Sequence, residues 1–232
     1  SAELFRALRT NVGFMIPSTV TNPVILVTSS INSEGKSYVA TNLAISLSLL
    51  HKKVALVGLD IRKPMLAKYL NLPTKGCVTS YLSDASYTVD DLIVASEFKG
   101  LDILPAGAIP PNPSELLQSQ RLDELFAELR KRYDYVVIDS APVAMVSDTF
   151  LLNRVADLTV YVSRARYTTT NLIDFIKQVH EQKRLPNIVT VLNGVGTTKK
   201  GYGYGYGYGY GYGYGYGHHI DKKKKWWQLK KA

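Results

Sequence analysis

The strongest constraint on the fold is a short apolar run that leads into a polar loop and then into a helical pattern. The run is PVILVT, residues 23–28, and the loop is SSINSEGKS, residues 29–37. Apolar residues then recur every three or four positions through Lys52, which predicts a helix. Strand, loop and helix in this order are typical of a phosphate-binding loop, where backbone N–H groups and a helix N-terminus hold phosphate oxygens.

Further apolar runs of strand length alternate with helical segments along the chain. The predicted strands are residues 54–57, 101–104, 135–138, 158–162 and 188–192, and the predicted later helices are 114–133 and 169–183. Such alternation favours an α/β fold of the P-loop NTPase type, with a mainly parallel sheet covered by helices on both faces. We expect one such domain over residues 1–198 and a disordered tail over 199–232.

The loop residues predict an ATP site. Residues 30–37 match the pattern G-x-x-x-x-G-K-[ST], except that Ser30 stands where the first glycine is usual. Lys36 would neutralise the β- and γ-phosphates of ATP, and the Ser37 hydroxyl would ligate Mg²⁺. The residues expected to bind the nucleotide from this segment are Ser33, Glu34, Gly35, Lys36, Ser37 and Tyr38.

Two carboxylates follow neighbouring predicted strands. Asp139 comes directly after YVVI, the position of an aspartate that holds Mg²⁺ in P-loop enzymes, and Asp60 follows VALVGL. Either one alone could instead cap a turn, but both belong at the carboxyl edge of the sheet, where ligands bind. We predict Lys36, Asp60 and Asp139 as catalytic residues and Ser37, Asp60 and Asp139 as metal ligands. Arg62 could contact phosphate or a neighbouring subunit, and the alternative is a solvated surface charge.

The C-terminal segment is of low complexity. Residues 201–217 read GYGYGYGYGYGYGYGYG, which places eight of the sixteen tyrosines in one glycine-rich stretch that disfavours a packed core. An ATP site and exposed phenols on one chain favour tyrosine phosphorylation, although a linker or self-association tract is the alternative. Residues 199–232 also carry +7 of the formal +9 charge. A basic segment could bind nucleic acid, KKKKWWQLKK equally suits an anionic membrane surface, and a solubilising terminus is the alternative to both.

Several segments, in order along essentially the whole chain, resemble the cytoplasmic domain of bacterial tyrosine kinases (BY-kinases) of the polysaccharide co-polymerase type. They are SSINSEGKSYVATNLA, VALVGLDIRKPML, GAIPPNPSELLQS, YDYVVIDSAPV and the tyrosine-rich C-terminus. Near the start, Glu3, Arg6 and Arg9 fit the family's E-x-x-R-x-x-R oligomerisation motif on a helix of about residues 1–15. Asn193 matches an asparagine that often meets the nucleotide base in this superfamily.

The resemblance implies an ATP- and Mg²⁺-dependent kinase that phosphorylates its own tail in trans within a homo-oligomeric ring. It implies a place at the cytoplasmic face of the bacterial inner membrane, as part of a membrane protein for exopolysaccharide or capsule export. The implied partners are a transmembrane and periplasmic co-polymerase region on the same or a separate chain, and a cognate tyrosine phosphatase; no nucleic-acid partner is implied. The implied phosphoacceptors are Tyr202, Tyr204, Tyr206, Tyr208, Tyr210, Tyr212, Tyr214 and Tyr216.

One position departs from the family pattern. The usual Asp-x-Asp after the second strand is Gly58-Leu59-Asp60 here, so Asp60 is expected either to accept the tyrosine proton or to support the metal. A nucleotide-switched assembly ATPase of the deviant P-loop class, with a tail that is not a substrate, is the alternative. That class carries an extra lysine early in the loop, where this chain has SIN, residues 30–32. An inactive P-loop adaptor is a third reading.

Overall fold

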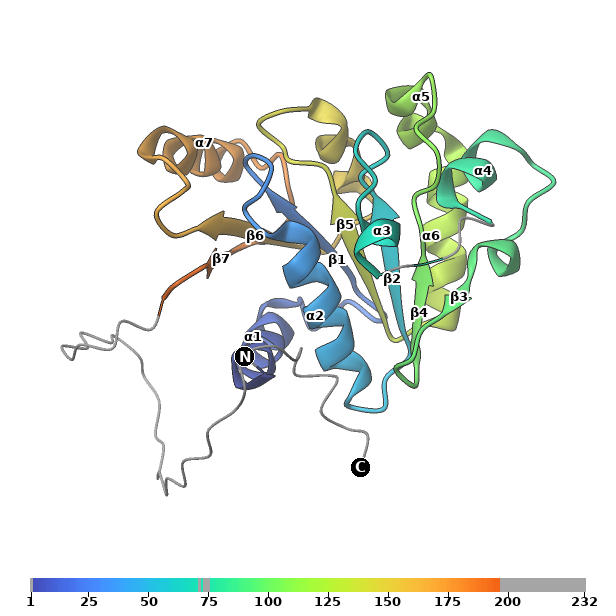
Figure 1. Cartoon of the computed structure of the whole chain (residues 1–232), viewed down its shortest axis with the longest axis horizontal. Helices are drawn as coiled ribbons and strands as arrows, with labels where there is room; N and C mark the ends of the chain where they lie inside the picture. The colour runs from blue at the N-terminus through green and yellow to red at the C-terminus, as the bar shows by residue number, and fades with distance from the viewer. Residues whose placement is uncertain (1, 71, 73–75, 197–232) are drawn as a thin grey trace.

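A computed structural model describes residues 2–70, 72 and 76–196 of the chain, so the predicted tail at 199–232 lies outside the described residues. A seven-stranded sheet with the order β3-β4-β2-β5-β1-β6-β7 forms the centre of the molecule (Figure 1). All neighbouring strands are parallel except the edge pair β3 and β4. The strands are β1 (Val24–Ser29), β2 (Val54–Leu59), β3 (Val94–Ala95), β4 (Leu101–Leu104), β5 (Tyr135–Ser140), β6 (Leu158–Arg164) and β7 (Ile188–Asn193).

Helices cover both faces of the sheet, which confirms the predicted α/β class. One core lies between the sheet and α1 (Ala2–Met15) with α2 (Lys36–Ser48), whereas the other packs the opposite face against α4 (Val78–Ser83), α6 (Gln120–Arg132) and α7 (Thr170–Glu181). The remaining helices are α3 (Leu66–Leu70), α5 (Pro113–Gln118) and the 3₁₀ helices η1 (Val89–Leu92) and η2 (Ser147–Arg154). The central strands are buried on both faces, as their continuous apolar sequences require.

The element boundaries differ from the sequence predictions at two helices. Helix α2 ends at Ser48, four residues before the predicted end at Lys52, and His51 follows with a positive φ of 59°. The predicted helix 114–133 is two helices, because Ser119 is extended with φ −66° and ψ 150°. The Ser119 hydroxyl donates to the Leu116 carbonyl at 2.7 Å, so it satisfies the end of α5 while α6 begins.

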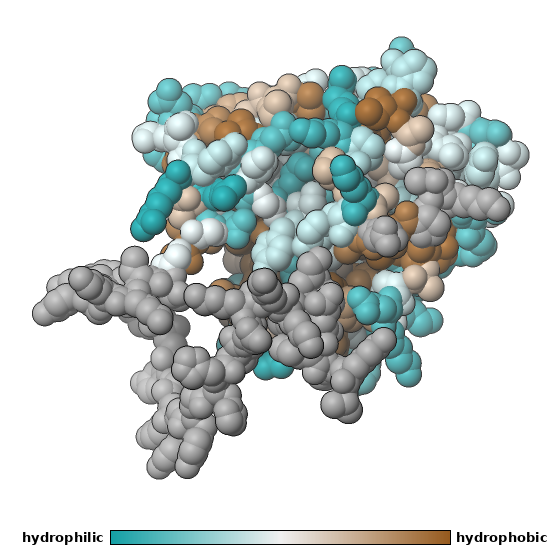
Figure 2. All heavy atoms as spheres, in the orientation of Figure 1, coloured by the Kyte–Doolittle hydropathy of each residue, from teal (hydrophilic) through white to brown (hydrophobic). Residues whose placement is uncertain are grey.

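The surface is mixed in character. On the face shown in Figure 2, hydrophilic residues are interspersed with small groups of hydrophobic ones. Within the part of the chain that the structure describes, none of the helices has the length and apolar content that crossing a bilayer demands.

Candidate nucleotide site

The predicted phosphate loop connects β1 to α2, so the strand–loop–helix arrangement is confirmed. Gly35 directly precedes α2 with a φ of +102°, a conformation that favours glycine. A Cβ atom added there would lie 2.2 Å from Nδ2 of Asn193, so a side chain would have to displace the Asn193 amide from the loop. The positive φ and this contact together favour glycine at position 35.

The loop is held in place by groups from its own turn and from the end of β6. Glu34 is fully buried, and its carboxylate accepts the Ile31 N–H at 2.8 Å and the Thr168 hydroxyl. Arg164 donates from Nη1 to the Ser33 carbonyl at 2.8 Å. The Glu34 side chain thus fixes the loop's shape, while its predicted contact with the nucleotide stays a prediction.

Ser30, which replaces the usual first glycine of the loop, has a partner. Its hydroxyl lies 3.1 Å from the hydroxyl of the buried Tyr161 on β6. Burial is the main reason that the pKa of Tyr161 is raised well above its usual range, so this phenol stays protonated. The Ser30 side chain is therefore accommodated as part of the loop's support.

The three predicted catalytic residues converge at the carboxyl edge of the sheet. The Lys36 Nζ atom lies 3.0 Å from Oδ2 of Asp60, and both side chains are nearly buried. The Asp60 N–H donates to the Asp139 carbonyl at 3.1 Å, and Asp60 Oδ1 accepts the Lys63 N–H at 3.0 Å. Asp60 therefore balances the charge of Lys36 and also shapes the turn after β2.

Asp139 on β5 is buried, and its Oδ1 atom has no hydrogen-bond partner among the described residues. Burial raises the pKa of Asp139 to about 6, and the charge of Asp60 adds to this, although Lys36 and the Ser37 hydroxyl lower it. A buried carboxylate oxygen without a donor is what a cation would satisfy. Ser37 and Asp139 therefore fit a Mg²⁺ ion, which takes few protein ligands and completes its shell with phosphate and water.

Arg62, a candidate phosphate contact, is engaged elsewhere. Its guanidinium pairs with the Asp148 carboxylate through Nε, and its Nη2 atom donates to the Ser114 hydroxyl at 3.2 Å. Burial raises the pKa of Asp148, but hydrogen bonds from Arg62 and Ser114 outweigh it and hold that pKa below its ordinary value. Arg62 thus joins the turn after β2 to α5 and η2, and no sequence pattern points to these partners.

Two other predicted nucleotide contacts lie against protein groups. The Tyr38 ring packs edge-on against Phe5 of α1, with 5.6 Å between ring centroids. Asn193 donates from Nδ2 to the Glu34 carbonyl at 2.9 Å, and its Oδ1 atom accepts the Gly194 N–H at 2.9 Å. The structure brings Asn193 onto the phosphate loop, and its contact with a base stays a prediction.

Gly58, which stands in place of the usual first carboxylate, faces a crowded position. A Cβ atom there would lie 3.0 Å from the Ala106 backbone nitrogen and 3.4 Å from Cδ2 of Leu66. The connection after β4 approaches β2 so closely that a side chain at 58 would require its backbone to shift slightly. The connection after β4 and the Leu66 side chain therefore occupy the space beside position 58 that a carboxylate side chain would need.

The predicted oligomerisation motif lies on α1 as expected, but its three residues have different surroundings. Arg6 and Glu3 form an exposed ion pair at 3.1 Å. Arg9 instead donates from Nη1 to the Ser46 carbonyl of α2 at 2.6 Å. Glu3 and Arg6 are available to a neighbouring molecule, whereas Arg9 ties α1 to the domain.

The AAA domain family model matches residues 24–189, from the start of β1 into β7. Tyrosine-protein kinase YwqD of Bacillus subtilis (strain 168) is 38% identical over 162 residues, which cover 70% of this chain and 68% of that protein. Tyrosine-protein kinase CpsD of Streptococcus agalactiae is 30% identical over 201 residues, or 86% of each protein. The chain belongs to the bacterial tyrosine-protein kinase family.

Solved structures agree with this assignment to the kinase family. The kinase domain of Escherichia coli tyrosine kinase ETK superposes with a TM-score of 0.79 at 29% identity and covers 88% of this chain and 80% of that chain. The BceF tyrosine kinase domain gives a TM-score of 0.75 at 35% identity, over 84% and 78% of the two chains. Kinase-family relatives can be much longer: the chain spans 27% of the length of tyrosine-protein kinase ptk of Acinetobacter johnsonii, with 32% identity over 200 residues.

Proposed function

We propose that the chain is the catalytic domain of an ATP- and Mg²⁺-dependent protein-tyrosine kinase that phosphorylates its own C-terminal tyrosines, residues 202–216, in trans. The observation that carries this proposal is the convergence of Lys36, Asp60 and Asp139 beside the phosphate loop, in a member of the tyrosine-protein kinase family. The tail tyrosines lie outside the described residues, so their role rests on the sequence.

The residues divide the work of phosphoryl transfer, which depends mainly on positioning and charge stabilisation. Lys36 neutralises charge on the transferred phosphoryl group, and backbone N–H groups of the loop orient the phosphates. Ser37 and Asp139 hold Mg²⁺, which supplies further charge neutralisation when bound. Asp60 loses its ion pair as Lys36 turns to phosphate, so its carboxylate becomes available to accept the phenol proton of the acceptor tyrosine.

The biological setting follows from the family resemblance. We propose that the domain assembles as a homo-oligomeric ring at the cytoplasmic face of the bacterial inner membrane, with Glu3 and Arg6 at the contacts between copies. Phosphorylation of the tail then regulates a polysaccharide co-polymerase that assembles and exports capsule or exopolysaccharide. A cognate tyrosine phosphatase would return the tail to its starting state.

Phosphate transfer can be tested directly. Purified protein is incubated with γ-labelled ATP and Mg²⁺, and label on tyrosine is compared with phosphate released to solution, followed by mass spectrometry of the tail. The kinase proposal requires label on tyrosine that a Lys36→Met variant fails to acquire. Phosphate release without labelled tyrosine would contradict it and support a nucleotide-switched assembly ATPase, whereas ATP binding without turnover would indicate an inactive adaptor.

A further inference from the structure

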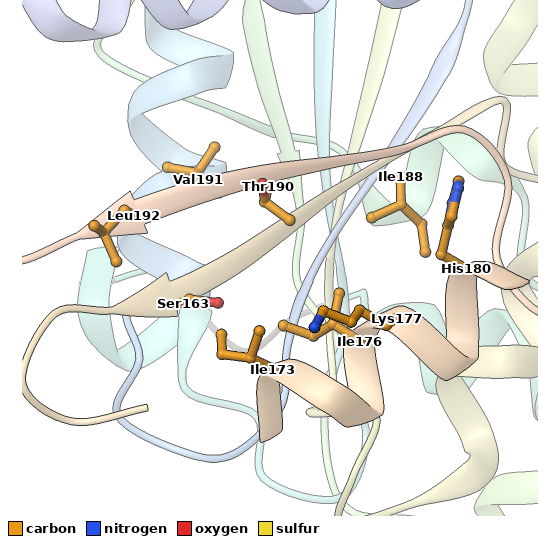
Figure 3. A pocket seen from close by; sticks show the side chains of 9 residues that line it. All are labelled: Ser163, Ile173, Ile176, Lys177, His180, Ile188, Thr190, Val191 and Leu192. Atoms are coloured by element: carbon orange, nitrogen blue, oxygen red, sulfur yellow. The ribbon is translucent and has the colours of Figure 1, made fainter. Parts of the chain in front are cut away.

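An apolar groove of about 450 Å³ lies between α7 and the edge strand β7 (Figure 3). Ile173 and Ile176 line it from the helix, and Ile188, Thr190 and Leu192 line it from the strand. Leu192 is 61% exposed and Ile173 is 38% exposed, so the groove presents large aliphatic side chains to solvent. Exposed apolar surface beside a sheet edge is typical of a site that another segment covers.

The outer edge of β7 also offers hydrogen-bonding groups. Among the described residues β7 pairs only with β6, and the carbonyls of Asn187 and Asn193 accept N–H groups from the β6 side. Backbone groups of successive strand residues point to opposite sides, so those of Ile188, Thr190 and Leu192 point outward. The same three residues therefore provide side chains to the groove and backbone partners for one more strand.

The chain itself continues into a segment suited to this edge. Seven residues, 194–200, separate the end of β7 from the glycine–tyrosine repeat at 201–217. In a strand, alternate residues share a face, so this repeat would place all of its tyrosines on one face and all of its glycines on the other. We propose that part of segment 201–217 folds back and pairs with the outer edge of β7 as an antiparallel strand, with tyrosine rings in the groove.

Physical chemistry favours this occupant. The entropic cost of closing a loop of about seven residues is low. A segment that turns back after such a loop runs antiparallel to β7. Tyrosine rings bury a large apolar area and keep a polar hydroxyl at the tip, which suits a groove that is apolar inside and carries Lys177 and His180 in its lining. Lys177 is itself paired with Asp174 at 3.3 Å. Because the repeat has a period of two, any shift by two residues places equivalent tyrosines in the groove.

This docking site would hold the tyrosine segment beside the phosphate loop. Leu192 precedes Asn193, whose amide contacts the Glu34 carbonyl of the loop. Tyrosines in the groove would be withheld from phosphorylation, while those beyond it would remain available to a neighbouring active site. The docking is independent of kinase activity, so it can hold even where the proposed function fails.

Amide hydrogen exchange measured by NMR tests the docking. A Lys36→Met chain, which keeps the tail unphosphorylated, is compared with the same chain ending at Gly196 and with a version in which all eight tail tyrosines are serine. We expect the outward amides of Thr190 and Leu192 to exchange at least about tenfold more slowly in the chain with tyrosines than in either control. The amides of Val189 and Val191 face β6 and serve as an internal reference. Equal exchange of the outward amides in all three chains would overturn the proposal.

Two variants and a dilution series sharpen the test. Thr190→Pro removes an outward donor that β6 does not use, and Ile173→Lys places a charge in the groove at an exposed position. Each should abolish the protection of Leu192 while the reference amides stay protected; retained protection in both would contradict docking at this site. The protection should also be independent of concentration over a roughly fiftyfold range, because the segment is on the same chain. Protection that rises with concentration would mean that another copy is the occupant and would overturn the assignment.

Discussion

Asp139 is the residue at which stability and the proposed activity conflict most directly. Its carboxylate is buried, one of its oxygens lacks a donor among the described residues, and its pKa is raised to about 6. Below pH 6 the folded chain therefore takes up a proton that the unfolded chain binds only near the ordinary value of 3.8. The free energy of unfolding therefore falls as pH rises from 3.8 to about 6. Above pH 6 the full cost of burying the charged Asp139 carboxylate is present.

We predict that Asp139→Asn raises the stability of the ligand-free domain at pH 8 by on the order of 1–2 kcal/mol, because it removes a buried charge. The difference in free energy of unfolding between variant and wild type should shrink as pH falls from 6 to 4. Urea denaturation across this pH range measures it. The same variant should lose tyrosine phosphorylation; a variant that is less stable than wild type at pH 8 and insensitive to pH would contradict this account of Asp139.

Asn193 allows two roles to be separated. If its amide braces the loop through the Glu34 carbonyl, Asn193→Ala should raise the KM for ATP and for GTP by the same factor, on the order of two- to tenfold for one lost hydrogen bond. If the Asn193 side chain instead contacts the nucleotide base, the ratio of the KM for ATP to the KM for GTP should change. Steady-state phosphorylation assays with both nucleotides measure this, and an Asn193→Asp variant, which sets a negative charge against the Glu34 carbonyl beside the phosphate loop, should raise both KM values by more than alanine does.

At the scale of elements, α1 is joined to the domain by side chains that meet α2. The Phe5 ring packs against Tyr38, the Ser46 hydroxyl donates to the Phe5 carbonyl at 3.1 Å, and Arg9 donates to the Ser46 carbonyl. Ser46 lies in the last turn of α2, where carbonyls lack partners within the helix and where a positive charge is favourable. Arg9 thus stabilises the C-terminal end of α2 and also holds α1 against α2.

We predict that Arg9→Ala lowers the free energy of unfolding by about 1–2 kcal/mol, since it removes a charge-assisted hydrogen bond at a helix end. The double variant Glu3→Ala with Arg6→Ala should leave stability within about 0.5 kcal/mol, because an exposed i,i+3 pair contributes little. That double variant should instead reduce the mass of the assembly. Urea denaturation and light scattering distinguish the two effects; an unchanged mass would mean that Glu3 and Arg6 form only a local pair.

At the scale of the whole molecule, charge is concentrated in the C-terminal segment. Residues 199–232 contribute +7 to a chain with a formal charge of +9. Each phosphotyrosine adds about −1.5 to −2 charges at neutral pH, so eight would add on the order of −12 to −16. Full phosphorylation would therefore reverse the sign of the chain's net charge.

We predict that phosphorylation occurs between copies and that heavy phosphorylation separates them, because like-charged tails repel and a charged phenol no longer suits a partner's site. A Lys36→Met full chain mixed with an active chain ending at Gly196 should acquire label on its tail. Light scattering before and after exhaustive phosphorylation then reports the mass. Lack of label on the inactive chain would refute the trans mechanism, and an unchanged mass would refute the separation.

Local sequence patterns were enough to predict the class of fold and the location of the nucleotide site. The spacing of apolar residues predicts the buried strands and the amphipathic helices. The GKS segment lies between a predicted strand and a predicted helix, which is the usual context of a phosphate loop. Lys36, Asp60 and Asp139 could be placed at one edge because parallel strands share their carboxyl ends. Strand β3 was not predicted, because its two residues are too few to form a periodic pattern.

The partners of these side chains depend on how distant segments pack together. Arg62 meets Asp148 across 86 positions of sequence, and Ser30 meets Tyr161 across 131. Such contacts depend on the order in which the strands assemble, β3-β4-β2-β5-β1-β6-β7, and periodicity within a segment carries no information about that order. The raised pKa of Asp139 likewise depends on burial by distant segments, and so does the exposure of β7 as an edge. Local pattern specifies each element, whereas desolvation and pairing arise only when the elements pack together.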